Sequence, residues 1–355
     1  MMLKNKLTMN LKVLAIFTAC ILPVHYALSL DELINSEGLN GRLRIGISSM
    51  ANLKVNYHGN SRQTALPSGL DSTTSGINRT YDDGYVNLDN TGNDNNDTWN
   101  WGYQEVSQVI AGADLIAFNS RQFSESSWKG TEDGDSKGIS LTWLKDPVDR
   151  NGLKVSFLVS LDLLSVDSDY NKSGTADYSL TTDSYSHTGV DMSLVPAPHT
   201  GTFEGPGPII VDSPTRTNTD FPGAGIAERN FELDGKLISI GSGIEIQHQV
   251  DENLFAMVQA RLMMAWFDGE FNYANNYSVG GTQFASESGS MNVSETSAGG
   301  SIGAGLMWKL DDGTSIFLNG NVMLLKSLKG KQDGRGFNVD LSEGFLVSLG
   351  IQESF

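Results

Sequence analysis

Apolar and polar residues alternate with a period of two along much of this chain. The alternation is clearest in segments 153–166, 231–249, 254–271, 297–309 and 314–327. In the first segment, one face carries Leu153, Val155, Phe157, Val159, Leu161 and Leu163, and the other carries Lys154, Ser156, Ser160 and Asp162. Successive side chains of a β-strand point to opposite faces, so these segments predict long strands with one apolar face.

Short and long connections alternate between these strands. Polar segments 146–152, 250–253 and 310–313 are short, whereas 127–137, 167–230, 272–296 and 328–338 are longer. Further strands are predicted at 42–57, 98–109, 113–126, 138–145 and 339–355, with a turn at 110–112 and a loop at 58–97. Transmembrane barrels combine strands of about 9–11 residues with short turns on one side and long loops on the other. The sequence therefore predicts an all-β, transmembrane antiparallel β-barrel of about ten strands, and eight to twelve fit the pattern.

The first residues have the pattern of a secretory signal peptide. Lys4, Lys6 and Lys12 lie around the start of the apolar run "VLAIFTACILPV", and small residues Ala27 and Ser29 follow. We expect cleavage after residue 29, leaving 30–355 as one barrel domain with long external loops at 58–97 and 167–230. The single cysteine lies inside the signal, so the mature chain is expected to lack disulfides and thiol ligands.

The last predicted strand, "EGFLVSLGIQESF", places Phe345, Val347, Leu349, Ile351 and Phe355 on one face. This pattern resembles the C-terminal signature of bacterial outer-membrane β-barrels, although Glu353 stands where such strands often carry an aromatic or apolar residue. The resemblance implies the bacterial outer membrane as location and the barrel-assembly machinery as a partner. The alternative is the edge strand of a secreted β-sandwich binding module.

A second segment, "RTYDDGYVNLD…TWNWGY", is similar to a motif in uncharacterised outer-membrane proteins of diderm bacteria. The resemblance covers only a short part of the chain and implies no activity.

The charge balance bears on partners. The sequence has 24 basic and 42 acidic residues, a net charge of −18, and three of the lysines lie in the predicted signal. Such a chain repels nucleic acid, so no nucleic-acid partner is expected. The expected partners are outer-membrane lipid and lipopolysaccharide, and the sequence does not indicate an oligomeric state.

Several charged residues fall on the polar faces of predicted strands. A charge facing lipid at mid-depth would cost roughly 2–4 kcal/mol, so these side chains are expected to point into the lumen. We predict a network of paired charges that closes or narrows the lumen; the alternative is a selectivity or gating element of a small pore. The residues are Arg42, Arg44, Lys154, Asp162, Glu245 and Arg261.

Aromatic residues mark the expected edges of the membrane. Trp99, Trp101 and Tyr103 share one face of predicted strand 98–109. Aromatic girdles lie at both interfaces of transmembrane barrels, so girdle positions are predicted here, with carbohydrate stacking as the alternative. The predicted girdle consists of Trp99, Trp101, Tyr103, Trp266, Trp308 and Phe355.

Acidic residues in the loop before this strand are candidate calcium ligands. The stretch "DNTGNDNND" lacks the spacing and the final Glu of an EF-hand loop, which leaves only an irregular site. Its candidate ligands are Asp82, Asp83, Asp89, Asp94 and Asp97. The sequence indicates no other cofactor.

Catalytic motifs are incomplete. Asp167 and Asp169 resemble the Asp-x-Asp pair of omptin-type barrel proteases, but the sequence contains no Asp-x-His pair to supply a base. A hydrolase active at the barrel rim is therefore the third hypothesis, and we expect no enzyme. The leading hypothesis is an outer-membrane barrel that is a small pore or has a structural or surface-interaction role.

Overall fold

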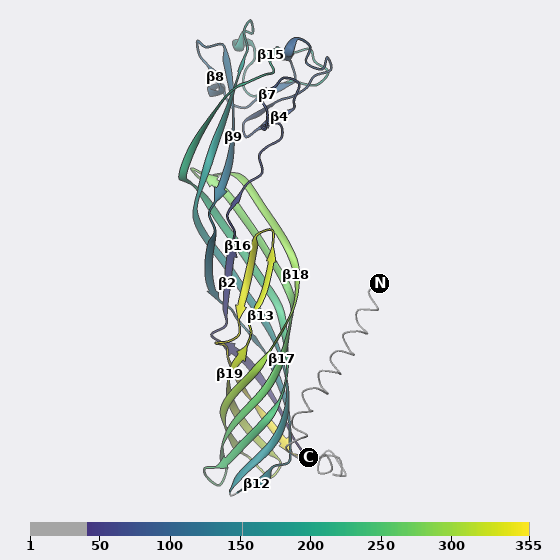
Figure 1. The fold of residues 1–355 in the computed structure, drawn as a ribbon, viewed down its shortest axis with the longest axis vertical. Coiled ribbons are helices and arrows are strands. Elements are labelled where there is room, and N and C mark those ends of the chain that lie inside the picture. Colours follow the sequence, from purple (N-terminus) through teal and green to yellow (C-terminus); the bar gives the residue numbers. More distant parts are fainter. Residues whose placement is uncertain (1–40, 151, 355) are drawn as a thin grey trace.

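Eight antiparallel strands close into a ring at the lower end of the molecule (Figure 1). The computed structural model describes residues 41–150 and 152–354. The pairing of β11 with β13 closes the ring, which we call the lower barrel. Its strands are β1 (Gly41–Ala51), β11 (Lys137–Lys145), β13 (Leu153–Ser186), β16 (Thr215–Gln249), β17 (Leu254–Val279), β18 (Thr282–Lys309), β19 (Thr314–Leu325) and β22 (Phe345–Ser354), and β12 (Val148–Arg150) pairs beside β13.

Four of these strands continue past the ring and form half of a second, upper barrel. Strands β13, β16, β17 and β18 are the continuous ones. The other half is a sheet in the order β10 (Trp128–Asp133), β2 (Lys54–Gly59), β21 (Arg335–Asp340) and β20 (Leu328–Gln332). Because β20 contacts β18 and β10 contacts β13, the two halves surround one interior.

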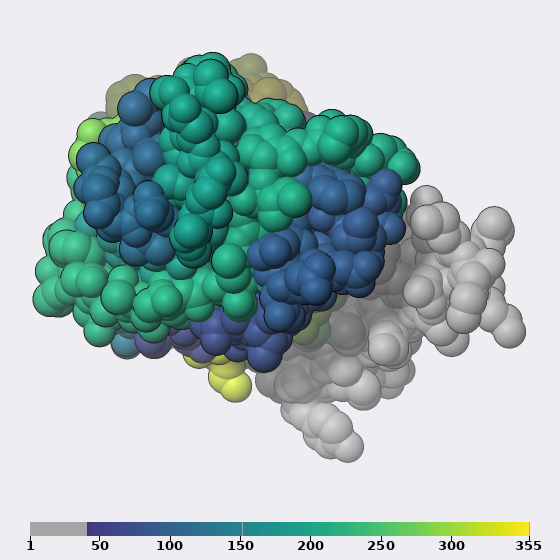
Figure 2. All heavy atoms as spheres, turned by 90° about the horizontal axis from the view of Figure 1, so that it is seen from above, coloured from purple at the N-terminus to yellow at the C-terminus, as the bar shows by residue number. Residues whose placement is uncertain are grey.

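The remaining strands form a cap above the upper barrel. Strands β13 and β16 extend into it, and β9 (Leu115–Glu125) pairs with the far end of β13. Figure 2, seen from above, shows the blue and teal cap segments covering this end. The other cap elements are β3 (Arg62–Gln63), β4 (Arg79–Tyr81), β5 (Gly84–Val86), β6 (Asp97–Thr98), β7 (Trp101–Tyr103), β8 (Val109–Ile110), β14 (His199–Thr200), β15 (Ile210–Val211) and the 3₁₀ helices η1 (Asp94–Asn96), η2 (Val106–Gln108) and η3 (Met192–Leu194).

The lower barrel exposes apolar side chains on its outer surface. Large apolar residues point outward from all eight ring strands and form a continuous belt. Its inner face carries small and polar residues in most of the alternate positions, together with buried Leu144, Leu158 and a cluster around Phe317. The belt includes Ile45, Ile47, Ile139, Leu141, Leu163, Ile238, Ile244, Val258, Leu262, Ile302, Leu306, Ile316, Leu318, Val322, Leu324, Leu349 and Ile351.

The upper barrel has the opposite polarity. Along β13 the outward positions become Ser165, Asp167 and Asp169, while Val166 and Tyr170 are buried inside. Apolar side chains from both halves pack into one core that fills the interior. Its aromatic members are Tyr57, Tyr170, Phe231, Phe267, Phe271, Tyr273 and Phe337.

Consecutive apolar residues mark the change of polarity. At each such pair, one side chain is exposed at the top of the belt and its neighbour is buried at the base of the upper core. Across strands, Leu163 pairs with Ile238, and Ile238 pairs with Trp266, so the change occurs at a common level. The pairs are Leu163–Leu164, Leu237–Ile238, Leu324–Leu325 and Phe345–Leu346.

The ring has eight strands, which is within the predicted range of eight to twelve but below its central value of ten. Predicted strands 98–109 and 113–126, and the predicted turn at 110–112 between them, lie in the cap, where β9 pairs with the far end of β13. These segments have strand-like patterns, but they pack against the cap core and not within the ring. The prediction of an all-β antiparallel barrel is confirmed, and the sandwich alternative is wrong because the sheet closes on itself.

Several predicted loops are strands. Most of 272–296 belongs to the β17–β18 hairpin, and 328–338 is the β20–β21 hairpin. Only 187–214 of the predicted loop 167–230 connects strands β13 and β16. Outward residues of these extensions are polar, so their sequences lack the apolar outer face of a membrane strand. The predicted signal at 1–29 and Phe355 lie outside the described residues. Within residues 41–150 and 152–354, no helix is both long enough and apolar enough to span a membrane.

Candidate functional site

The lumen of the lower barrel contains a buried ion pair. Arg44 on β1 and Glu245 on β16 meet across the interior, with exposed side-chain fractions of 3% and 0%. The two form a two-pronged contact in which Arg44 Nη2 donates to Glu245 Oε1 at 2.8 Å and Nη1 donates to Oε2. Arg44 Nε also donates to Gln352 Oε1 at 2.8 Å. A charge in such a place is stable only when it is paired and hydrogen-bonded.

Arg42 extends this contact. Its Nη1 donates to Gln247 Oε1 at 3.0 Å, and its Nη2 donates to Ser156 Oγ at 2.5 Å. Gln247 Nε2 in turn donates to Glu245 Oε1 at 2.7 Å. Three of the predicted lumen residues therefore lie in one network that crosses the barrel.

A second network lies in the same lumen. Arg261 Nη1 donates to Ser160 Oγ at 3.0 Å and lies 3.7 Å from Asp162 Oδ2. Hydroxyls from two other strands, those of Ser140 and Ser239, donate to Asp162 at 2.6 and 3.1 Å. Asp162 and Arg261 are thus held by strands on several sides of the ring, which leaves the polar interior filled with side chains.

Lys154, the sixth predicted lumen residue, is not part of either network. It lies over the ring of Phe255, 5.3 Å from the centroid, and pairs with no carboxylate in the described part of the chain. Phe255 belongs to a small apolar cluster with Met257, Met307 and Phe317. Around Lys154 the lumen is therefore filled by these apolar side chains, where paired charges were predicted.

A third ionic cluster lies at the upper end of the upper barrel. Glu125 on β9 accepts from Arg229 Nε at 2.5 Å and from Arg335 Nη2 at 3.2 Å, and all three side chains are at least nine-tenths buried. Tyr277 donates to the same carboxylate at 3.4 Å. The sequence analysis missed this cluster because its members are far apart in the chain, and because Arg229, Tyr277 and Arg335 lie on strands that were interpreted as loops.

The predicted aromatic girdle is wrong for the Trp-x-Trp-x-Tyr segment. Trp101 and Tyr103 are 0% and 2% exposed, and they lie in the core of the cap. Tyr103 donates to the Val195 carbonyl oxygen, and Trp101 Nε1 donates to that of Pro208 at 2.8 Å. Since these rings are covered by protein, they contact neither lipid nor an external sugar.

The other predicted girdle residues have different positions. Trp99 is partly buried in the cap, where its Nε1 donates to the Phe203 carbonyl oxygen at 3.3 Å. Trp266 and Trp308 point outward on β17 and β18, at the upper and lower edges of the apolar belt. Phe355 is outside the described residues.

The candidate calcium ligands are bonded to protein groups. Asp82 binds Arg121, Asp83 binds Asn119, and buried Asp89 accepts from Thr91. Asp94 and Asp97 follow in η1 and β6. Among the described residues, no three acidic, histidine or cysteine side chains are grouped to hold a metal ion. The acidic stretch therefore shapes the cap loop through hydrogen bonds of its own.

The cap core contains a tyrosine pair that the sequence analysis did not identify. Tyr81 and Tyr185 hydroxyls lie 2.6 Å apart, and Tyr81 donates to Asp183 at 2.7 Å. Arg216 forms a two-pronged contact with Asp183, with both nitrogens at 2.7 Å. Burial raises the pKa of Tyr185 to about 12 and raises the pKa of Tyr81 further. Tyr81 lies about a hundred positions before Asp183 and Tyr185 in the chain, so no local motif joins it to them.

We expect Glu245→Gln to lower the free energy of unfolding by about 3–5 kcal/mol, because Arg44 would keep its charge without a countercharge. Denaturant titration of the folded protein in detergent measures this change. The double variant Arg44→Met with Glu245→Met should regain most of the loss, since neither charge remains. A loss below about 1 kcal/mol for Glu245→Gln would show that the pair is screened like a surface pair.

The tyrosine pair predicts an alkaline transition of the cap. Tyr185 ionises at its ordinary pKa of 10.0 when unfolded but at about 12 when folded. Stability from the neutral form is complete below pH 10.0 and is lost as pH rises toward about 12. Near-ultraviolet circular dichroism measured against pH should show this loss. In Tyr185→Phe the loss should be smaller, and an unchanged profile would contradict the assignment.

Comparison with known proteins supplies low similarities only. No family model and no curated protein matches the chain. The outer membrane protease OmpT from Escherichia coli aligns over 90% of this chain and 98% of its own, with 7% identity and a TM-score of 0.27. The attachment invasion locus protein Ail of Yersinia pestis aligns over 86% and 98%, with 12% identity and a TM-score of 0.20. The toluene transporter TodX of P. putida aligns over 90% and 91%, with 7% identity and a TM-score of 0.18. These TM-scores are too low to support a conclusion about this chain. The fold is therefore described from the chain's own strand pairing.

Proposed function

We propose that this chain is an outer-membrane β-barrel protein with a closed lumen that presents its upper barrel and cap outside the cell as an interaction surface. The observation that carries the proposal is the apolar belt, which surrounds all eight ring strands and ends at one level. Water does not favour a continuous apolar surface of this kind, whereas the hydrocarbon layer of a membrane does.

Strand lengths agree with this placement. The uninterrupted ring strands β1, β11, β19 and β22 have 11, 9, 12 and 10 residues. A tilted strand needs about 9–11 residues to cross the hydrocarbon layer. The short turns 250–253 and 310–313 lie at the lower end, and the extensions and cap lie at the other. Barrels of this kind place short turns in the periplasm and long segments outside, which orients the cap toward the exterior.

The filled interior supports a closed barrel over a pore. Two ionic networks occupy the lower lumen, and the aromatic core of the upper barrel lies above them. A water-filled channel needs a polar path along the whole barrel axis. In the upper barrel, apolar side chains fill the cross-section and interrupt such a path. Ions or solutes would have to displace that core.

The cap supports an interaction role. Its own buried core, with Trp101, Phe118 and Tyr185 fully covered, holds the loops in defined positions. Large apolar side chains are nevertheless exposed on its surface: Val106 by 70%, Leu194 by 79% and Phe203 by 52%. Contiguous apolar patches mark contact surfaces, and we propose that these side chains contribute to one on the cap.

We propose no catalytic role. Asp167 and Asp169 point outward from β13 above the belt, where Asp167 faces Asp234 and Asp135. These neighbours and burial raise the pKa of Asp167. A cluster of carboxylates without a histidine lacks the base that the predicted hydrolase would need.

Leu262→Arg places a charge at an outward belt position that is 60% exposed. We expect the free energy of unfolding in lipid bilayers to fall by about 2–4 kcal/mol, because the charge would face hydrocarbon. Asn272→Arg on the same strand is the matched control, since it points outward above the belt, and its effect should stay within about 0.5 kcal/mol. Equal effects of the two substitutions would show that the belt is not in lipid.

Planar-bilayer recording tests the closed lumen. The protein, purified from the outer-membrane fraction and shown by heat-modifiable gel mobility to be folded, should produce no steady channels. A porin reconstituted in the same bilayers is the positive control. Reproducible conductance steps from the folded protein would contradict the closed state and favour the small pore. A protein found only in soluble fractions would overturn the membrane placement itself.

A further inference from the structure

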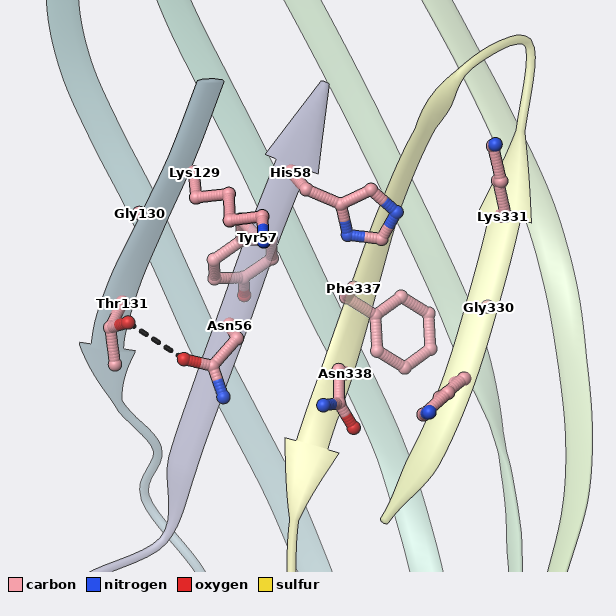
Figure 3. Close-up of a pocket in the computed structure, with 11 residues that line it drawn as sticks. Asn56, Tyr57, His58, Lys129, Gly130, Thr131, Gly330, Lys331, Phe337 and Asn338 are labelled. Carbon is pink, nitrogen blue, oxygen red and sulfur yellow. Dashed lines mark hydrogen bonds between the residues drawn. The ribbon is translucent and has the colours of Figure 1, made fainter. Parts of the chain in front are cut away.

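A groove with basic walls lies on the outer surface of the upper barrel (Figure 3). It has a volume of about 680 Å³ and runs across the sheet β10–β2–β21–β20. Its residues form two rows across the four strands. The first row is Lys129, His58, Gly336 and Lys331, and the second is Thr131, Asn56, Asn338 and Lys329.

A glycine in the first row makes room for the His58 imidazole. Gly336 pairs with His58 on one side and with Lys331 on the other. A Cβ at Gly336 would lie 2.8 Å from Cε1 and 2.9 Å from Nε2 of His58, so a side chain there would displace the imidazole. The imidazole therefore lies over the backbone of Gly336, with Lys129 at one end of the row and Lys331 at the other.

The lysines of the groove lack acidic partners. Lys129, Lys329 and Lys331 form no ion pair within the described residues, whereas Lys54, Lys172 and Lys309 each do. Burial lowers the pKa of His58, and the positive charges of Lys331 and Lys129 lower it further. In a chain with a net charge of −18, three lysines without ion pairs around one groove form a local exception.

Hydrogen-bonding groups for a saccharide lie beside these cations. Thr131 Oγ1 donates to Asn56 Oδ1 at 2.7 Å, which leaves the Asn56 amide nitrogen directed into the groove (Figure 3). Asn338 Oδ1 is buried and has no hydrogen-bond partner. Lysine ammonium groups bind phosphate, and amide groups bind sugar hydroxyls, so the groove offers both kinds of contact.

Position narrows the choice of ligand. Along β19 and β20, Lys329 and Lys331 follow the last belt residue Leu324 by five and seven residues, or roughly 16–23 Å of strand at ~3.3 Å each. In the outer leaflet this level lies outside the acyl chains, among the sugars and phosphates that lipopolysaccharide carries.

A row of carboxylates lies on the other half of the upper wall. On the other half of the barrel, Asp167 pairs with Asp234, and Asp234 pairs with Glu270, all facing outward. Such a row repels anions. An anionic saccharide near the barrel is therefore repelled by the carboxylate row and attracted by the lysines of the groove.

We propose that this cationic groove binds phosphate groups on the core saccharide of lipopolysaccharide in the same outer leaflet. The inference rests on the proposed outer-membrane placement. Lys129, Lys329 and Lys331 contact the phosphate oxygens, and Asn56 and Asn338 contact neighbouring sugar hydroxyls. The bound saccharide would fix the barrel's rotation relative to its surrounding lipids.

The test uses the folded full-length protein in detergent and a soluble probe, the delipidated phosphorylated core oligosaccharide. Calorimetry should detect binding by the unmodified protein. The groove variant Lys129→Gln, Lys329→Gln and Lys331→Gln should weaken it by about tenfold or more, because it removes three charge-assisted contacts. The control variant Lys145→Gln, Lys172→Gln and Lys309→Gln makes the same charge change elsewhere and should change binding by less than about twofold.

Two further arms identify the ligand chemistry. The same oligosaccharide after removal of its phosphates should bind as weakly as the phosphorylated probe binds the groove variant. A sulfated heparin oligosaccharide that binds more tightly than the core probe would overturn lipopolysaccharide as the source. Equal binding of the core probe to the unmodified protein and the groove variant, with heat-modifiable mobility intact in both, would overturn the groove. Because the probe is soluble, this outcome is independent of the membrane fractionation that tests the proposed function.

Discussion

The structure depends on which face of the barrel wall, outer or inner, carries the apolar side chains. Below one level they face outward, and above it they face inward, so the same eight-stranded wall is built for two different surroundings. A strand alternates its faces with every residue, and its apolar face can change sides only where the alternation is shifted by one position. The adjacent pair Leu163–Leu164 on β13 makes this shift without a break, while β1 and β2 are separated by a turn at Asn52.

The inversion also decides what fills each interior. Where the outside is apolar, the inside carries polar groups, and these must satisfy one another, as Arg44 and Glu245 do. Where the outside is polar, the inside is free for Phe271 and its neighbours to pack as in a soluble protein. The filled lower lumen, the exposed belt and the polar outer wall that carries the groove thus belong to one division of the wall.

The alternation in the sequence was sufficient to predict the barrel, the inward charges and most ring strands. It was not sufficient for the strand count, because segments such as 113–126 have the same period but pack in the cap. The extensions at 272–296 were interpreted as loops because their outward residues are polar. Trp101 was assigned to lipid because an aromatic ladder has the same pattern at a membrane interface and in a small buried sheet. The groove was missed because Lys129, His58 and Lys331 become neighbours only through pairing across strands.

Strands β13 and β16 run without interruption from the lower turns into the cap, over 34 and 35 residues, and are paired with each other along nearly all of that length. A partner that pulls on the cap would therefore load this pair along its axis. When a paired sheet is pulled along its strands, many hydrogen bonds share the load. When two strands are peeled apart from one end, their hydrogen bonds break one after another. With the cap outside the cell, as proposed, a pull on it would be carried to the lower barrel by the backbones of these two continuous strands.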